Sequence, residues 1–356
     1  MFRTDWSRIH ETGGFHLYTL PLACISFLYS IGVRARNHTL KNKGNKLPGF
    51  VLSLGNITAG GTGKTPATIM LARWAKSEGY NVAILSRGYG GKYQNDAAVV
   101  SDGKSILLSP EISGDEPWLM ANVLRDIPVI VSRTRYVAGL KAKKAFNCNF
   151  FILDDGFQHF RLKRDMDIVL ADAMRPFGNG HLLPWGPLRE PVSGLKRADA
   201  VIFTGAGNSN KEKYKKSFFN KPLFTGDHAP DKIIYSSGGK EFDISYLNGK
   251  RVIAFSGIAK PESFKKSLLN LGADVVSFRA FGDHYTFKKK DIQNLLKEQE
   301  VLKGELVITT EKDWARIREM EVETEALAYL TIKFVITSGK DKLFNTIKEK
   351  ADAVIK

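Results

Sequence analysis

The segment 55–66, GNITAGGTGKTP, has the composition and spacing of a phosphate-binding loop. An apolar stretch typical of a strand precedes it at 50–54, and a run with helical periodicity follows it. Glycines let backbone N–H groups turn toward phosphate oxygens, Lys64 can reach the terminal phosphates, and the Thr65 hydroxyl can hold Mg²⁺. Thr58 stands where the usual pattern has a glycine, but this order of elements favours a nucleoside triphosphate site over an incidental glycine-rich turn. The predicted nucleotide contacts are Thr58, Ala59, Gly60, Gly61, Thr62, Gly63, Lys64 and Thr65.

Two adjacent carboxylates end a second apolar stretch. The sequence FFILDD at 150–155 finishes in Asp154 and Asp155. Functional loops of a parallel sheet gather at the carboxyl ends of its strands, and an acid there can orient Mg²⁺ or a water ligand in phosphoryl transfer. Paired carboxylates also occur as turn and cap residues. The phosphate loop upstream favours the metal role.

Two short motifs offer candidates for proton transfer. SGDEP at 113–117 places Asp115 and Glu116 before an amphipathic stretch, where a helix-capping role and a catalytic role fit the sequence equally well. GDHYTF at 282–287 holds His284 among aromatic residues. A lone histidine in such a setting is more often structural, but a position across an interdomain cleft would let it receive a proton near neutral pH.

The stretch 175–191 is too rich in Gly and Pro for a helix or a strand. Long ordered loops of this composition usually bind something. Arg189 can clamp a phosphate through two hydrogen bonds, and Glu190 can reach a metal. The alternative is a scaffold loop with a surface ion pair.

These candidates need a framework, and the rest of the chain indicates a parallel sheet flanked by helices, because short apolar strands alternate with helical stretches. The first group of expected strands is 50–54, 81–85, 129–131, 150–153, 168–170 and 201–203. The second group comprises strands at 252–255, 275–278 and 306–308, with helices at 261–271, near 291–296 and from 342 to the C-terminus. We therefore predict an α/β protein with a P-loop NTPase-type parallel sheet domain at 37–205, a linker region at 206–249 and a smaller second α/β domain at 250–356.

The N-terminal region has a different character, since 12–33 contains no Asp, Glu, Lys or Arg and is rich in apolar residues. It approaches the roughly 20 residues needed to cross a bilayer, but Pro21 and several hydroxyl residues weaken that reading. A basic cluster from Arg34 to Lys46 follows the run instead of preceding it, which argues against a signal peptide. The remaining interpretations are a core helix and a helix in the cytoplasmic leaflet with its basic flank on anionic headgroups. The basic flank favours the second, so 1–36 is predicted to be membrane-associated.

Composition limits the class of partner. The 356 residues are 43% hydrophobic and 25% charged, which is ordinary for a globular protein. The 53 Lys and Arg against 37 Asp and Glu give a net charge of +16, which implies acidic partners such as nucleic acid, anionic lipid or a phosphorylated substrate. No basic-aromatic strip or nucleic-acid module is present, so we predict no nucleic-acid partner. Cys24 and Cys148 lack neighbours at metal-ligand spacing, which argues against zinc and a disulfide framework and fits a reducing cytoplasm.

Together these motifs resemble the tetraacyldisaccharide 4'-kinase family over almost the whole chain. The motifs that carry the resemblance are GNITAGGTGKTP, SRGYGG at 86–91, GDEP, ILDDGFQH, FGNGHLLPWGPLREP, FSGIAKPESF at 255–264, GDHYTF and TTEKDWAR at 309–316. The resemblance implies a membrane-associated N-terminal segment, a P-loop kinase domain, a β-stranded linker and a smaller α/β domain. It also implies that ATP donates its γ-phosphate to the 4'-hydroxyl of an acylated glucosamine disaccharide 1-phosphate at the cytoplasmic face of the bacterial inner membrane.

The resemblance also assigns roles to single residues. It makes Asp115 the general base on the sugar hydroxyl, with His284 pairing with it. Lys64 would neutralise the β- and γ-phosphates, and Thr65 with Asp154 would position Mg²⁺. The supporting residues would be Asp155, Arg189 and, as a weaker metal candidate, Glu190.

A membrane-associated P-loop switch ATPase is the alternative from another functional class. In such a protein hydrolysis drives dimerisation or partner release, and no small molecule is phosphorylated. Glycine-rich GGTGKT loops occur there as well. Such switches need neither the Gly-Pro loop at 175–191 nor an Asp-His pair in a second domain.

Overall fold

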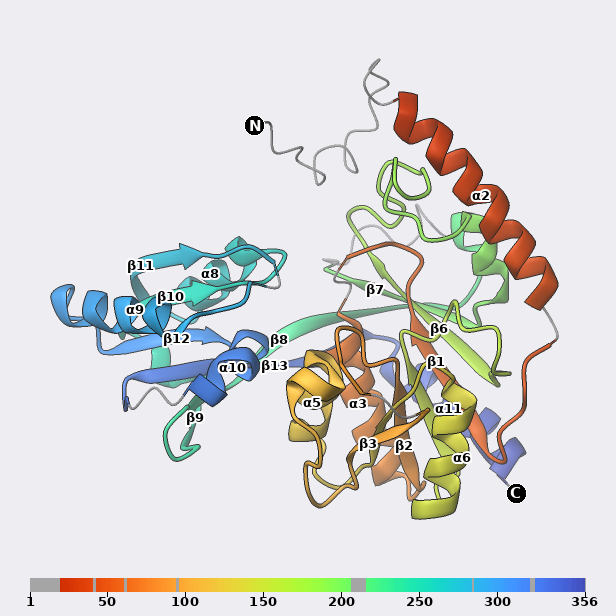
Figure 1. Ribbon diagram of the computed structural model, residues 1–356, viewed down its shortest axis with the longest axis horizontal. Helices are drawn as coiled ribbons and strands as arrows, with labels where there is room; N and C mark the ends of the chain where they lie inside the picture. The colour runs from red at the N-terminus through yellow and green to blue at the C-terminus, as the bar shows by residue number, and fades with distance from the viewer. Residues whose placement is uncertain are drawn as a thin grey trace.

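The computed structural model describes residues 20–40, 43–60, 63–93, 96–205, 216–283, 285–320 and 324–355. The chain forms two α/β bodies joined by a pair of long strands (Figure 1). One mixed sheet of 13 strands runs through both bodies in the order β11-β10-β12-β13-β8-β7-β6-β1-β5-β2-β4-β3, with β9 paired to β8. The two predicted α/β units are therefore parts of one continuous sheet.

The first body is built on strands that are nearly all fully buried. These strands are β1 (Phe50–Gly55), β2 (Val82–Ser86), β3 (Ala98–Ser101), β4 (Val129–Val131), β5 (Phe150–Asp154), β6 (Met166–Asp172) and β7 (Ala200–Thr204). The helices of this body are α2 (Leu20–Leu40), α3 (Lys64–Ser77), α4 (Pro110–Ser113), α5 (Asp115–Val123), α6 (Arg135–Phe146) and α11 (Lys340–Ile355). Short 3-10 turns follow at η2 (Val192–Arg197) and η3 (Lys216–Phe218).

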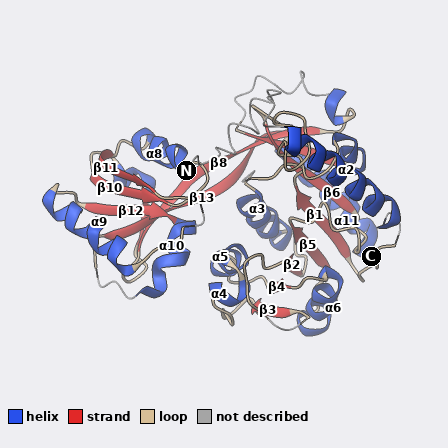
Figure 2. Ribbon diagram, turned by 45° about the horizontal axis from the view of Figure 1, so that its top comes forward, coloured by secondary structure: helices blue, strands red, loops and turns tan. Residues whose placement is uncertain are grey.

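Alternate residues of these strands enter different cores, which explains why the strands read as continuous apolar runs. Phe50 and Leu52 of β1 pack with α3, α5 and α11 on one face, whereas Val51 packs with α6 on the other. The pairs β1–β5, β1–β6, β2–β5 and β2–β4 are all parallel, so their carboxyl ends meet at one edge of the sheet. Figure 2 shows helices on both sides of this sheet.

The second body repeats the layered arrangement on a smaller scale. Its strands are β9 (Glu241–Asp243), β10 (Arg251–Ser256), β11 (Asp274–Ala280) and β12 (Leu306–Thr310). Its helical segments are η4 (Ile244–Leu247), α8 (Pro261–Asn270), α9 (Lys289–Val301), α10 (Glu311–Ile317) and η5 (Arg318–Met320). α8 covers one face of the sheet through Phe264 and Leu268, and α9 covers the other through Ile292 and Leu295.

The antiparallel pair β8 (Leu223–Tyr235) and β13 (Leu327–Ser338), here called the ribbon, connects the bodies (Figure 1). β7 pairs with the start of β8, and β12 pairs with the start of β13. Between these contacts the residues of the ribbon from Asp227 to Pro230 pair with β13 alone among the described residues. The crossing between the bodies is therefore two strands wide.

All nine expected strands are present, with ends within two residues of those predicted. The predicted boundaries fit less well. The linker region 206–249 contains the whole of the ribbon strand β8 and also β9 and η4 of the second body, although 206–215 lies outside the described residues. α11, which we assigned to the second domain, buries Leu343 and Ile347 in the core of the first body. The N-terminal helix α2 runs to Leu40, past the predicted boundary at 36.

Candidate functional site

The phosphate loop connects β1 to α3 as predicted. α3 begins at Lys64, and the residue before it, Gly63, has a left-handed backbone with φ of 80°. The loop leaves β1 at the edge where the parallel strands β2 and β5 also end. Free backbone N–H groups at the start of a helix attract phosphate, so the geometry suits the predicted nucleotide contacts. Gly61 and Thr62 lie outside the described residues.

The Gly-Pro loop at 175–191 is hydrogen-bonded to the phosphate loop through the backbone. Ala59 donates a backbone hydrogen bond of 2.6 Å to the carbonyl of Pro187, and Arg189 donates one of 2.8 Å to the carbonyl of Ile57. Thr58 forms an antiparallel bridge with Leu188 between these bonds. The Gly-Pro loop thus packs on one side of the phosphate loop and holds the residues predicted to contact the nucleotide.

Two cations converge on one carboxylate beside the loop. Lys64 Nζ lies 3.5 Å from Asp155 Oδ1, and an Arg189 nitrogen donates to both Asp155 oxygens at 3.0 and 2.9 Å. Burial opposes the ionisation of Asp155, but Lys64 and Arg189 outweigh it and lower the pKa of its carboxyl. Asp155 also has a positive φ of 50°, a conformation that Asp tolerates better than most residues. The result is a compact charged cluster with excess positive charge, as a polyphosphate requires.

Asp154 lies deeper and in a different environment. The hydroxyls of Thr68 and Ser86 donate to its two oxygens at 3.3 Å each. Burial raises the pKa of Asp154 to about 7, and the charges of Glu116 and Asp155 add to the rise. A buried carboxylate whose two oxygens accept hydrogen bonds from neutral hydroxyls suits a divalent metal ion.

Asp154 and Thr65 are the residues that could supply protein oxygens to a Mg²⁺ ion. Within the described ranges, no group of three or more His, Cys, Asp or Glu side chains is placed to hold a metal ion. Mg²⁺ usually takes one or two protein oxygens and completes its shell with waters and nucleotide phosphates. Asp154, with Thr65 at the start of α3, is a set of that size.

Glu190 is buried and hydrogen-bonded within the first body. Its Oε1 accepts hydrogen bonds of 2.7 Å from both Gln158 and Arg197, and its side chain is almost completely buried. A Cβ on Gly194 would lie 2.2 Å from its Oε2. Glu190 is therefore anchored through Oε1 by Arg197, which also lies over the Phe157 ring, while its buried Oε2 has no hydrogen-bond partner among the described residues, so its metal role stays a prediction.

Asp115 opens α5 and bonds to the second body. Arg316 of α10 donates a 2.9 Å hydrogen bond from Nε to Asp115 Oδ2. Next to Asp115, Glu116 Oε1 lies 3.7 Å from Nζ of Lys312, which also belongs to α10. The predicted partner His284 lies outside the described residues, so the pairing of Asp115 with His284 stays a prediction. The bond to Arg316 was missed, although Arg316 ends the TTEKDWAR motif.

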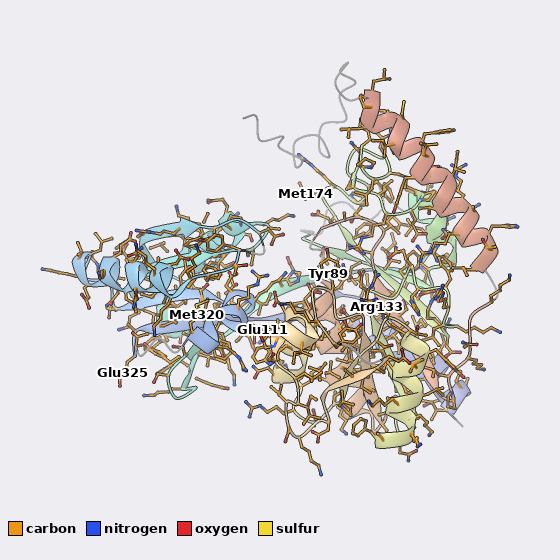
Figure 3. All side chains as sticks on the ribbon, viewed as in Figure 1. Tyr89, Glu111, Arg133, Met174, Met320 and Glu325 are labelled. Atoms are coloured by element: carbon orange, nitrogen blue, oxygen red, sulfur yellow. The ribbon has the colours of Figure 1, made fainter. Side chains whose placement is uncertain are left out.

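A cavity of about 270 Å³ adjoins the start of α5. It is lined by Arg87, Gly88, Tyr89, Gly90, Gly91, Tyr93 and Arg133. Figure 3 labels Tyr89 and Arg133, which both belong to the first body. A Cβ on Gly114 would lie 2.6 Å from the carbonyl oxygen of Tyr89, so the cavity loop passes directly against the residue before Asp115. The cavity offers two guanidinium groups and two tyrosines to a polar, anionic ligand.

His228, in the ribbon, is a second residue that the sequence did not reveal. A Cβ on Gly63 would lie 2.1 Å from the Cε1 and Nε2 atoms of His228, so the imidazole packs directly against the phosphate loop. Burial lowers the pKa of His228, and Asp227 opposes that shift. The ring packs edge-on against Phe334 across the ribbon. The pairing of β8 with β13 places His228 beside the phosphate loop.

α2 has one face on the protein and one face exposed. Ser26 donates to the carbonyl of Leu182 at 2.8 Å, and Tyr29 donates to the carbonyl of Arg189 at 2.9 Å. The large apolar side chains of this helix with exposures of 47% to 66% are Leu20, Ile25, Phe27, Leu28 and Ile31. No helix in the described part of the chain is long and apolar enough to cross a bilayer.

Comparison with known proteins decides the family. A sequence model of the tetraacyldisaccharide-1-P 4'-kinases matches residues 18–352. The chain belongs to this family. A tetraacyldisaccharide 4'-kinase of Syntrophus aciditrophicus is 42% identical over 340 residues, which is 91% of each chain, and one of Pelobacter propionicus is 40% identical over 306 residues, 86% of this chain and 83% of that relative.

A solved member of the family has the same fold. The crystal structure of the "apo" form of LpxK from Aquifex aeolicus in complex with ATP matches with a TM-score of 0.77 and 34% sequence identity, over 94% of this chain and 98% of that one. The predicted family resemblance and the predicted α/β fold are thus confirmed. Membership of a kinase family makes the chain a phosphotransferase.

Proposed function

We propose that the protein transfers the γ-phosphate of ATP to the 4'-hydroxyl of an acylated glucosamine disaccharide 1-phosphate, the lipid A precursor. Family membership over residues 18–352 supports the reaction. One arrangement supports its location: α5, which begins at Asp115, packs in the same core as α3, which begins at Lys64. In this proposal Asp115 presents its carboxylate to the acceptor hydroxyl beside the residues assigned to the nucleotide.

The donor half of the site belongs to the first body. Lys64 would neutralise the β- and γ-phosphates, and Arg189 with Asp155 would hold Lys64 in position through the contacts described above. Thr65 and Asp154 would hold Mg²⁺, which when bound neutralises charge on the β- and γ-oxygens. Phosphoryl transfer depends mainly on positioning and charge neutralisation, which these side chains provide.

The acceptor half combines Asp115 with the neighbouring cavity. Asp115 would orient the 4'-hydroxyl and take its proton late in the transfer, and His284 would pair with Asp115 as the family motif implies. The cavity of about 270 Å³ beside Gly114 would receive the sugar headgroup, with Arg87 and Arg133 facing its anionic groups.

The lipid substrate calls for a membrane-facing surface, and α2 is the proposed one. Its large apolar side chains such as Phe27 and Leu28, each 66% exposed, lie opposite the face that packs on the Gly-Pro loop. The basic residues in the last turns of the helix and after it, such as Arg34 and Lys43, would contact anionic headgroups. Because ATP is supplied by the cytoplasm, we place the enzyme at the cytoplasmic face of the inner membrane, without a nucleic-acid partner.

Label transfer tests the proposal directly. The full chain is incubated with γ-labelled ATP, Mg²⁺ and acylated disaccharide 1-phosphate in detergent micelles, and lipids are separated from water-soluble products. Label in the lipid is expected, and chelation of Mg²⁺ should abolish it. Label only in free phosphate would instead support a membrane-associated P-loop switch ATPase, especially if ATP also changed the oligomeric state.

A further inference from the structure

Arg316 makes bonds in both bodies. Nε donates to Asp115 of the first body at 2.9 Å, and one terminal nitrogen donates to the Gly257 carbonyl and to Asp313 Oδ1 at 3.2 Å each within the second body. Only 9% of its side chain is exposed. Its guanidinium is thus fixed in direction on the second-body side and also bonded to the Asp115 carboxylate of the first body.

Asp313 holds Arg316 in that direction. It is fully buried and accepts hydrogen bonds from the Gly257 N–H at 2.9 Å and the Thr310 hydroxyl at 2.7 Å. The Thr310 hydroxyl in turn accepts from the Asp313 N–H at 3.1 Å and caps α10. A buried carboxylate with several donors is a rigid support for an arginine.

The neighbouring ion pair shows what an incidental contact between the bodies looks like. Lys312 and Glu116 lie 3.7 Å apart with side chains 29% and 44% exposed. An exposed ion pair of this kind contributes little to stability. The Arg316–Asp115 bond is shorter, more buried and directional, and it engages Oδ2 and not Oδ1 of the carboxylate.

We propose that Arg316 is a positioning residue for the transfer reaction: it holds Asp115 by Oδ2, turns Oδ1 toward the acceptor hydroxyl, and so makes turnover depend on contact between the bodies. This rests on the proposed role of Asp115. Arginine suits the task because it stays protonated and bonds in fixed directions.

The test compares Arg316→Met, Arg316→Lys and Lys312→Met in full-length protein, by measuring label transfer to the disaccharide lipid and the affinity for ATP. Arg316→Met should lower kcat about 100-fold, because misplacing a reacting group by 1 Å has effects of that order. Its Kd for ATP should stay within about twofold, since the donor half lies in the first body. Arg316→Lys should recover part of kcat, and Lys312→Met should change it by less than about twofold.

Two further variants keep the test decisive. Asp313→Asn releases Arg316 without touching Asp115 and should reproduce the loss of kcat even if Arg316→Met folds poorly. Asp115→Asn separates the two proposals. If Asp115→Asn is inactive while Arg316→Met or Asp313→Asn turns over at or above the wild-type rate, the inference about Arg316 is overturned and the proposed function stands. If Asp115→Asn itself keeps its activity, the assignment of Asp115 fails, and the inference fails with it.

Discussion

The two bodies fix their functional side chains in different ways. Asp154 ends a fully buried strand of the first body, and its partners Thr68 and Ser86 belong to the same body. Arg316 of the second body instead donates a hydrogen bond to Asp115 of the first body, 201 positions away in the chain. The donor half is therefore built within one core, whereas the acceptor half depends on how two bodies meet.

The largest expected effect breaks the acceptor half alone. Asp115→Asn keeps the size of the side chain but removes its charge, and kcat should fall about 10³-fold, within the range for loss of a general base. ATP affinity, measured by calorimetry, should change less than about twofold because the nucleotide residues lie elsewhere in the first body. Asp126→Asn, an exposed change on the same body, is the control. A large loss of ATP affinity would show that the two halves are not separate.

A second effect concerns exposed apolar surface, which is concentrated on α2 in the first body and scattered in the second. Phe27→Ser with Leu28→Ser should lower binding to anionic vesicles by about tenfold or more, since each apolar side chain withdrawn from lipid costs about 2 kcal/mol. Flotation assays measure this binding. Leu269→Ser, which alters a side chain 51% exposed on the second body, should leave it unchanged. An equal loss of vesicle binding in the α2 variant and in Leu269→Ser would contradict the assignment of α2 as the membrane surface.

A smaller effect is expected where the ribbon touches the donor half. His228→Ala removes the ring that lies on Gly63 and should weaken ATP binding by about fivefold, equal to about 1 kcal/mol. Turnover at saturating ATP should change less than the Kd for ATP. His38→Ala on exposed α2 is the matched control. Unaltered ATP affinity in His228→Ala would mean that the ribbon does not support the phosphate loop.

The smallest effect concerns stability at the interface. Burial raises the pKa of Glu311 to about 7, while Arg73 of the first body opposes the rise. Because the folded state binds this proton more tightly than the unfolded state, the residue destabilises the fold as the pH rises from about 4.5 to 7. Glu311→Gln should therefore raise Tm by a few degrees at pH 8 and leave it unchanged at pH 4.5. Calorimetry that shows the same difference at both values would contradict the titration.

The predictable parts of the molecule are those whose cause is local in the sequence. Strands β1, β2 and β5 bury both faces, so each appears as a continuous apolar run. Lys64 follows the β1 run across the phosphate loop and Asp154 ends the β5 run, so their proximity could be inferred from the rule that parallel strands end at one edge.

The parts that were missed depend on distant partners. β8 contains Gly226 and Pro230 and is half-exposed, so it lacks the pattern of a buried strand, and its partner β13 lies about 100 positions away. The ion pair of Glu190 with Arg197 was missed because nothing in the sequence shows that Arg197 turns back to it. Arg316 could be noticed as part of a motif, but its bond to Asp115 exists only when the two bodies are in contact.

The path of the chain has a consequence for biosynthesis. The second body is inserted within the first, because β13 returns the chain to α11, whose residues Leu343 and Ile347 pack beneath β1. The core around the phosphate loop therefore lacks one of its covering helices until α11 has left the ribosome. A chain that stops before residue 340 would contain every residue assigned to the nucleotide and still expose part of the apolar face of β1. Newly made protein should gain ATP binding only once α11 has been made.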